Sequence, residues 1–259
     1  MPPYKDLRSF VTLRRIVARL RGPRGCPWDR AQTPVSLKTS FLEEAYEVLE
    51  AIDKDDAAAL RDELGDLMLH VMLQAQMASE AGRFKIEDVI ENINRKLIHR
   101  HPHVFGEARV SGPDEVVANW EVLKREERPE GKSVMDSVPG DLPALARANS
   151  LQRRAAGVGF DWPDVSGIMD KLAEEVSELG KATSHEEKAR EYGDVLFTLV
   201  NIARRQNIDP EAALREANRR FAARFRCMEE LCRKRRLRLE KLTLDEQNAL
   251  WEEAKKRVR

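Results

Sequence analysis

Acidic residues recur three positions apart at several places in the chain. In the C-terminal half, Glu175 and Glu178 form one such pair, and Glu191 and Asp194 form the next. Residues three apart lie on one face of a helix, with Cβ atoms about 5–6 Å apart. Carboxylates held this close repel each other unless a cation lies between them. The spacing therefore points to side chains that bind a metal ion.

The two acidic pairs are placed symmetrically about residues 183–187, TSHEE, which read as a turn followed by a capping box. Glu178 and Glu191 are equidistant from the point between Ser184 and His185 in this segment, and so are Glu175 and Asp194. A helical hairpin folded there brings the members of each pair level with one another. The sequence thus predicts four carboxylates that converge between two antiparallel helices.

The acidic pairs of the N-terminal half are also placed symmetrically about a turn. Glu47 and Glu63 are equidistant from Asp55, inside the turn DKDD, and so are Glu44 and Asp66. We therefore expect a second hairpin with a second set of candidate metal ligands: Glu44, Glu47, Glu63 and Asp66. A single acidic pair is more often a solvated helix face, but a symmetric pattern that occurs twice favours a ligand cluster.

Hard oxygen ligands without cysteine suit Mg²⁺ or Mn²⁺. A di-iron helical bundle is the competing interpretation, but it uses Glu-x-x-His motifs, and the second acidic motif is Glu-x-x-Asp in both halves. His70 follows Asp66 by four residues, yet its counterpart in the other half is Thr198. We expect His70 to be a core residue rather than a ligand.

Cations and aromatic residues at helical spacing accompany the acids. Arg220 and Arg224 are four residues apart, as are Trp251 and Lys255. A phosphate substrate needs such cationic contacts to its outer oxygens, and an aromatic face suits a base. The corresponding pairs in the N-terminal half are Lys96 with Arg100 and Trp120 with Lys124. CPWD (26–29) and GFDWP (159–163) precede the acidic helices and either cap the core or line a nucleotide pocket.

Apolar residues recur at helical spacing along most of the chain, as in the stripe formed by Leu42, Ala45, Val48, Leu49 and Ile52. Strand-like alternation is nearly absent, so the sequence predicts an all-α protein. No apolar run approaches the about 20 residues of a membrane span. We accordingly expect no membrane partner.

The net charge and the cysteine content exclude further classes of protein. Lys plus Arg and Asp plus Glu both number 45, so the formal net charge is zero, which argues against a nucleic-acid-binding protein. The three cysteines form no Cys-x-x-Cys pair, which excludes a disulfide framework and a cysteine-rich zinc site. Together with a first segment that lacks a signal-peptide pattern, they favour a reducing cytoplasm.

The two halves of the chain repeat each other. FLEEAYEVLE at 41–50 corresponds to KLAEEVSELG at 171–180, and DELGDLMLH at 62–70 corresponds to REYGDVLFT at 190–198. Nearly constant offsets indicate a duplicated unit of roughly 120 residues. The segment between the halves is rich in Pro, Gly and charge. We predict an N-terminal domain at 1–128, a linker at 129–142 and a C-terminal domain at 143–259.

Several segments resemble the MazG family of nucleoside triphosphate pyrophosphohydrolases. They are CPWD, LEEAYEVLEAI, RDELGDLMLHV and HRHPHVF in the first half, and VGFDW, EEVSE and EYGDVLF in the second. The resemblance covers essentially the whole chain. It implies two tandem all-α domains of the four-helix-bundle type, a homodimer, Mg²⁺ dependence, and hydrolysis of nucleoside triphosphates to monophosphate and pyrophosphate.

The resemblance also assigns residues. The family's acidic positions match Glu175, Glu178, Glu191 and Asp194, and its phosphate- and base-contacting positions match Lys171, Arg220, Arg224, Trp251 and Lys255. Trp251 is expected to stack on the base. Stacking does not distinguish one base from another, so it fits broad base specificity. Glu174 or Glu178 is expected to accept the proton of the attacking water.

The two copies differ around their acids. Lys171 and Asn201 have Ser40 and Leu73 as their N-terminal counterparts. We therefore predict that the C-terminal copy is the main catalytic one, with Asn201 among its substrate contacts. Two alternatives remain: a non-enzymatic helical protein that binds nucleotides or another regulator, and a ferritin-like di-iron oxidase. Pyrophosphate release and metal analysis would separate them.

Overall fold

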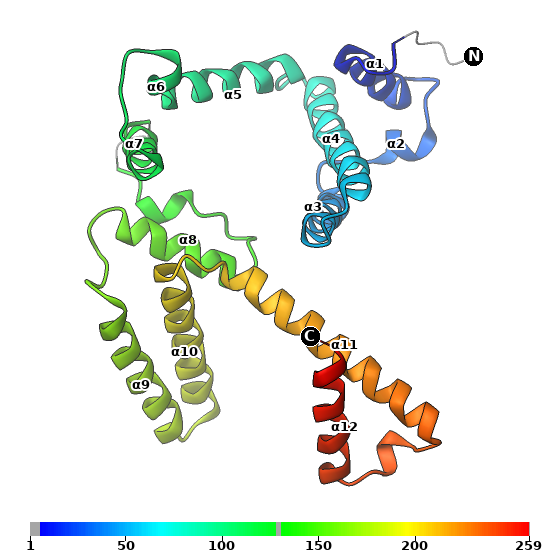
Figure 1. Ribbon diagram of the computed structural model, residues 1–259. Helices are drawn as coiled ribbons and strands as arrows, with labels where there is room; N and C mark the ends of the chain where they lie inside the picture. The colour runs from blue at the N-terminus through cyan, green and yellow to red at the C-terminus, as the bar shows by residue number, and fades with distance from the viewer. Residues whose placement is uncertain (1–5, 128–130, 259) are drawn as a thin grey trace. The chain divides into compact units, whose positions relative to one another are not determined.

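The computed structural model describes residues 6–127 and 131–258. Its described residues form helices and no strand, which confirms the all-α class. The chain divides into two compact units, Met1–Glu126 and Glu127–Arg259 (Figure 1). The predicted boundary between residues 128 and 129 lies outside the described residues. No described helix is both long and apolar enough to cross a membrane.

The first unit is built around a hairpin of two long helices, α3 and α4, against which α1 and α5 pack. Val17, Leu37 and Met72 lie in its apolar core, together with Leu73 and Ile86. The helices are α1 (Phe10–Arg21), α2 (Pro27–Ala31), α3 (Lys38–Asp53), α4 (Ala57–Glu80), α5 (Ile86–Arg100), α6 (Pro102–Phe105) and α7 (Pro113–Glu126).

The turn between α3 and α4 lies where the symmetry of the acids predicts it. Asp55 adopts a left-handed conformation with φ of 52°, which reverses the chain. The side chain of Asp56 accepts hydrogen bonds from the backbone N–H groups of Ala58 and Ala59 and so caps α4. This short connection forces α3 and α4 to run antiparallel, with their acidic pairs facing each other.

The second unit contains two helical hairpins. α9 packs on α10, α11 packs on α12, and α8 lies against α10 and α11. Met228, Leu231 and Leu250 form a core between α11 and α12. The helices are η1 (Val134–Ser137), α8 (Ala144–Ala156), α9 (Val165–Lys181), α10 (His185–Arg205), α11 (Pro210–Arg235), η2 (Leu239–Lys241) and α12 (Leu244–Arg257).

The α9–α10 hairpin also turns at the predicted place. The backbone N–H of Glu187 donates to Ser184 Oγ at 3.1 Å, and Glu187 Oε2 accepts from the N–H of Ser184 at 3.1 Å. This capping box starts α10 at His185, with three residues between it and the end of α9 at Lys181. Part of the predicted linker is ordered as η1, which packs on α8.

Candidate active site

Three carboxylates converge between α9 and α10. Oxygen atoms of Glu175, Glu178 and Glu191 all lie within 4.8 Å of one another. Glu175 is buried, with 6 % of its surface exposed, whereas Glu191 is half-buried and Glu178 is exposed. The group therefore opens to solvent on one side. Such an arrangement of oxygen ligands from two helices can bind a divalent cation.

Lys171 supplies positive charge to this cluster. Its Nζ lies 2.8 Å from Glu175 Oε1 and 2.9 Å from Glu174 Oε1, one turn further along α9. Hydrogen bonds to Glu175 and Glu174 raise the pKa of Lys171 well above its ordinary value, so its ammonium group stays charged. The ammonium thus offsets part of the repulsion that the carboxylates would otherwise exert.

Asp194, the fourth expected ligand, lies outside the group of three. It is exposed on α10, one turn beyond Glu191. Its role as a ligand stays a prediction.

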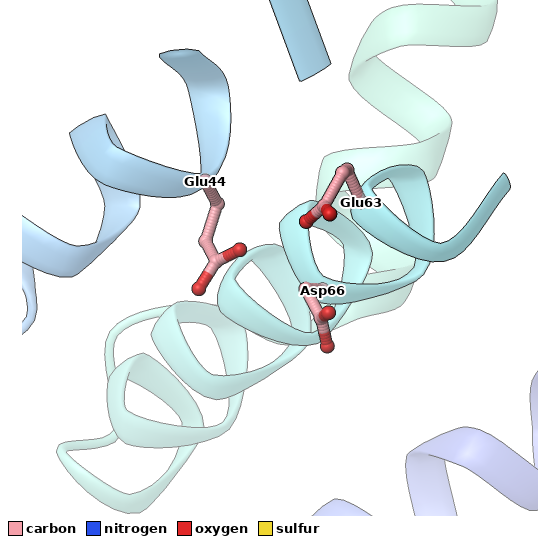
Figure 2. A group of neighbouring side chains, drawn as sticks. All are labelled: Glu44, Glu63 and Asp66. Atoms are coloured by element: carbon pink, nitrogen blue, oxygen red, sulfur yellow. The ribbon is translucent and has the colours of Figure 1, made fainter. Parts of the chain in front are cut away.

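The N-terminal hairpin carries a matching group. Figure 2 shows Glu44 on α3 facing Glu63 and Asp66 on α4, and their oxygen atoms lie within 4.8 Å of one another. Partial desolvation and the neighbouring carboxylates, first among them Glu47, raise the pKa values of both Glu44 and Glu63. All four acids predicted here therefore interact.

No lysine occupies the N-terminal counterpart of Lys171. Ser40 stands there, and its hydroxyl donates to the backbone carbonyl of Leu37 at 3.3 Å. His70 is a buried residue, as expected, with its Nε2 at 3.9 Å from Glu44 Oε1. Its Nδ1 is buried without a hydrogen-bond partner. The N-terminal acids thus lack the ammonium group that the C-terminal acids have.

Four of the expected phosphate- and base-binding residues, Arg220, Arg224, Trp251 and Lys255, lie on the other hairpin of the second unit. Arg220 pairs with Glu216 of its own helix at 3.3 Å. The Trp251 ring lies 5.2 Å from the ring of Phe221. Lys255 pairs with a residue three positions before it on α12. Among the described residues, α9 packs substantially on α10 alone, so these side chains are not brought onto the carboxylates.

Arg224 is half-buried on α11, and its Nε is buried without a hydrogen-bond partner. In the first unit, the guanidinium of Arg100 lies over the ring of Trp120 at 5.2 Å. The cation–aromatic pairing seen in the sequence therefore recurs as a contact there. The substrate roles of Arg220, Arg224, Trp251 and Lys255 stay predictions.

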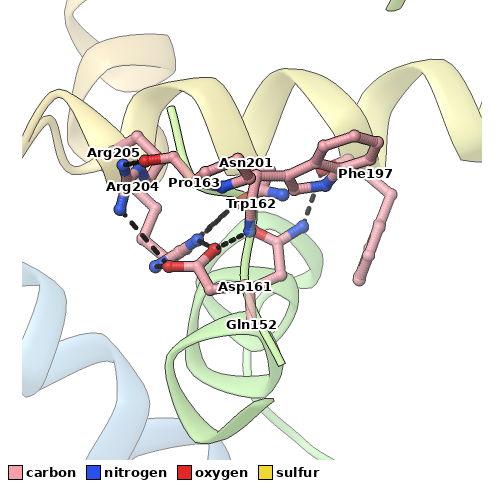
Figure 3. Close-up of polar contacts among 8 residues, drawn as sticks. All are labelled: Gln152, Asp161, Trp162, Pro163, Phe197, Asn201, Arg204 and Arg205. Carbon is pink, nitrogen blue, oxygen red and sulfur yellow. Dashed lines mark hydrogen bonds and ion pairs between the residues drawn. The ribbon is translucent and has the colours of Figure 1, made fainter. Parts of the chain in front are cut away.

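Asn201 belongs to a polar network on the side of α10 that faces α8 (Figure 3). Its Oδ1 accepts hydrogen bonds from Arg204 Nε at 3.0 Å and from Arg204 Nη2 at 2.7 Å. Arg204 also forms a two-pronged ion pair with Asp161. Partial desolvation raises the pKa of Asp161, but the hydrogen bond and charge of Arg204 outweigh it and lower that pKa overall.

Sequence reasoning missed this network. Asp161 and Arg204 were not among the expected site residues, and neither was Gln152, whose Nε2 donates to the Phe197 carbonyl at 2.8 Å. The available signals were the GFDWP segment and the spacing of Asn201 and Arg204 by three residues on one helix. An ion pair between residues 43 positions apart has no local pattern that reveals it.

Comparisons with known proteins decide the family. Residues 32–105 match the model of the MazG nucleotide pyrophosphohydrolase domain. A Thermotoga maritima protein named nucleoside triphosphate pyrophosphohydrolase/pyrophosphatase MazG is 45 % identical, over 95 % of both chains. The chain belongs to the MazG family.

Further matches agree. The Escherichia coli K12 nucleoside triphosphate pyrophosphohydrolase is 42 % identical to this MazG protein, over 96 % of the chain and 98 % of the relative. The uncharacterized Bacillus subtilis protein YabN is 45 % identical over the whole chain, which spans 55 % of YabN. The family expected from the motifs is thus confirmed, and so is the enzyme class, a hydrolase of acid anhydrides.

The family models also mark the duplication. A second model, phosphoribosyl-ATP pyrophosphohydrolase, matches residues 160–221 of this MazG chain. Each matched range contains one complete acidic hairpin, α3–α4 or α9–α10. The expected tandem arrangement of two MazG-like domains is therefore confirmed.

Proposed function

We propose that this MazG protein is a Mg²⁺-dependent nucleoside triphosphate pyrophosphohydrolase of broad base specificity, with its main active site at the C-terminal carboxylates. The reaction is the hydrolysis of a nucleoside triphosphate to the monophosphate and pyrophosphate. Family membership and the names of the relatives support the activity. The convergence of Glu175, Glu178 and Glu191 is the observation that supports the site.

The donor set fits Mg²⁺. The group contains only carboxylates, which are hard oxygen ligands, and its exposed side leaves room for water and phosphate oxygens. Mn²⁺ accepts the same ligands. Neither histidine nor cysteine joins this group within the described part of the chain, which disfavours a di-iron centre. We propose Asp194 as a further ligand when the site is loaded.

Bound Mg²⁺ would polarise a water molecule and the phosphate that it attacks. Glu175, Glu178 and Glu191 would hold the ion. Glu174 lies outside the group of three and adjoins Lys171, so it is placed to accept the proton of the water. Glu178 is the second candidate for this role, because it is the exposed member of the group.

Lys171 would then change partners. With Glu175 engaged as a metal ligand, the ammonium group of Lys171 would be available to contact a phosphate oxygen of the substrate. Arg220, Arg224 and Lys255 supply further positive charge, which neutralises the leaving pyrophosphate. Arg220 and Lys255 lie on the α11–α12 hairpin and are paired with acids of their own helices, so substrate binding would require them to exchange these pairs for phosphate and to approach the carboxylates.

We also propose that the protein is a homodimer in the cytoplasm. The α9–α10 hairpin exposes Val176, Tyr192 and Leu199, a face that a single hairpin cannot bury. A second hairpin packed there would complete a four-helix bundle around the carboxylates. The three cysteines are all free, which suits a reducing compartment. Neither nucleic acid nor membrane is part of this proposal.

Substitution of Glu178 tests the proposal. Glu178→Gln should reduce hydrolysis below detection, while circular dichroism shows unchanged helix content, because this exposed side chain contributes little to the core. Glu186→Gln, an acid in the first turn of α10, is the matched control and should retain activity. The products of the unmodified protein should be monophosphate and pyrophosphate. Full activity of Glu178→Gln, or release of mainly orthophosphate, would contradict the proposal.

A further inference from the structure

The acids of the N-terminal hairpin have a histidine beside them that the C-terminal acids lack. Glu63, Asp66 and His70 share one face of α4, because residues three and four positions apart lie on the same side of a helix. Glu44 faces Glu63 and Asp66 from α3 (Figure 2). The counterpart of His70 in the second unit is Thr198. The two hairpins therefore differ in a residue type that commonly binds metal ions.

The imidazole ring of His70 is buried against these acids. Only 7 % of the residue is exposed, and its Nε2 lies 3.9 Å from Glu44 Oε1. The ring packs edge-to-face against Phe41, and its Nδ1 is buried without a hydrogen-bond partner. A buried polar ring with incomplete hydrogen bonding costs free energy, which a bond between nitrogen and a metal ion can offset. The structure thus holds a nitrogen ligand next to the carboxylates.

The distances fit one bound ion. Two ligand atoms on opposite sides of a divalent ion, each about 2.1 Å from it, are about 4.2 Å apart. The 3.9 Å between His70 Nε2 and Glu44 Oε1 is within this span, and the 4.8 Å that encloses the three carboxylates is close to it. Asp66 is exposed, and Glu44 and Glu63 are half-buried, so rotation about their side-chain bonds can close the remaining gap.

The same place in the C-terminal hairpin holds an ammonium group. There, Lys171 contacts Glu175 from within α9. In the N-terminal hairpin, Glu44 is the counterpart of Glu175, and the group that faces it is the imidazole of His70 from α4. An ammonium group repels a metal ion, whereas an imidazole nitrogen can donate a lone pair to it. The two copies therefore place a phosphate-binding group and a metal-binding group at equivalent carboxylates.

We propose that His70 joins the three N-terminal carboxylates in a metal site that prefers divalent transition ions, such as Fe²⁺ or Zn²⁺, to Mg²⁺. Imidazole nitrogen is a ligand for transition metals, whereas Mg²⁺ is bound by oxygen ligands. The proposal reverses our expectation from sequence that His70 is not a ligand. It goes beyond the proposed hydrolysis, because it concerns metal binding by the copy to which we assign little turnover.

Isothermal titration calorimetry on the full chain, without a histidine tag, tests this site. The background carries Glu175→Gln with Glu191→Gln, which disables the C-terminal ligands and leaves the N-terminal ones. In this background, His70→Leu should raise the Kd of Zn²⁺ at least about tenfold and change the Kd of Mg²⁺ less than about twofold, because only a nitrogen ligand is lost. His99→Leu, which replaces an exposed histidine of α5, is the matched control and should change neither Kd.

Two outcomes of this titration would overturn the proposal. Equal changes of the two Kd values in His70→Leu, or no change in either, would show that the imidazole is not a ligand. Asp66→Asn should weaken the binding of both ions, because both use this carboxylate. Unchanged Zn²⁺ affinity in Asp66→Asn would place the ion away from the N-terminal acids.

A second comparison leaves the buried histidine in place, so it does not depend on the stability of His70→Leu. The complementary background, Glu44→Gln with Glu63→Gln, keeps only the C-terminal carboxylates. The ratio of the Mg²⁺ Kd to the Zn²⁺ Kd should be at least about tenfold larger at the N-terminal site than at the C-terminal site. Equal ratios would contradict the proposal. Hydrolysis is not measured here, so this result is independent of the proposed function.

Discussion

Lys171 Nζ lies 2.8 Å from Oε1 of Glu175, the most buried carboxylate of the C-terminal cluster. The same ammonium group contacts Glu174, which places one positive charge among the acids before any metal arrives. In the N-terminal copy Ser40 takes this position, and its hydroxyl donates to the carbonyl of Leu37, the residue that precedes α3. The two hairpins thus share their acids and differ in the cation that faces them.

Removal of this cation should impair turnover. In Lys171→Met, we expect kcat/KM for nucleoside triphosphates to fall about ten- to a hundredfold, because a charge-assisted phosphate contact is lost. Lys181→Met, at the exposed end of the same helix, is the matched control and should change kcat/KM less than about twofold. Steady-state kinetics on both variants decides this, and equal losses would exclude a specific role for Lys171.

The crowded acids of the N-terminal copy should make its stability depend on pH. Desolvation and the neighbouring carboxylates raise the pKa values of Glu44 and Glu63. Their folded-state pKa values therefore exceed the unfolded-state value of 4.5. The contribution of these two side chains to the free energy of unfolding is thus most favourable below pH 4.5, and it is lost as the pH rises through their folded-state pKa values.

The corresponding measurement is the melting temperature of Glu63→Gln without divalent metal. We expect this variant to melt at a higher temperature than the unmodified protein near neutral pH, and the difference to vanish below pH 4.5. Asp62→Asn changes the exposed neighbour, which pairs with Arg61, and serves as the control. A melting temperature of Glu63→Gln below that of the unmodified protein at neutral pH would contradict the expected repulsion.

Divalent cations should stabilise the folded protein. A ligand that binds only the folded state, at a concentration one hundred times its Kd, adds about 2.7 kcal/mol to the free energy of unfolding. We expect Mg²⁺ to raise the melting temperature, and Glu175→Gln with Glu191→Gln to reduce this rise. KCl at equal ionic strength controls for screening. An equal rise with KCl would show that no specific site exists.

The hairpins could be predicted from sequence because their determinants are local. The turn residues around Asp55 and Ser184 and the mirrored spacing of the acids fix which carboxylates face one another. The sequence could not decide which three of four acids gather most closely. That depends on the side-chain rotamers in each hairpin, since Asp66 joins its group while Asp194, of the same length, stays outside.

The surroundings of the acids were harder to predict, for a different reason. The Asp161–Arg204 pair and the contact of Gln152 with Phe197 join segments more than 40 residues apart. Sequence spacing identifies helix faces, but it does not say which faces meet. Likewise, the sequence shows Arg220 and Trp251 at helical spacing from a second cation, with counterparts in the N-terminal half. In the described residues, however, Arg220 and Trp251 lie on a different hairpin from the acids.

The clearest separation of the two copies comes from paired double variants. Glu175→Gln with Asp194→Asn should remove most activity, because it disables the copy that has Lys171 and Asn201. Glu44→Gln with Asp66→Asn should remove much less, since Ser40 and Leu73 give its copy neither a cation nor a polar partner at these positions. One missing cation alone slows turnover by about ten- to a hundredfold. Both variants should be assayed at saturating nucleotide and Mg²⁺, with sedimentation to verify the oligomeric state. If the N-terminal variant loses as much activity with its assembly intact, the main site is not in the C-terminal copy.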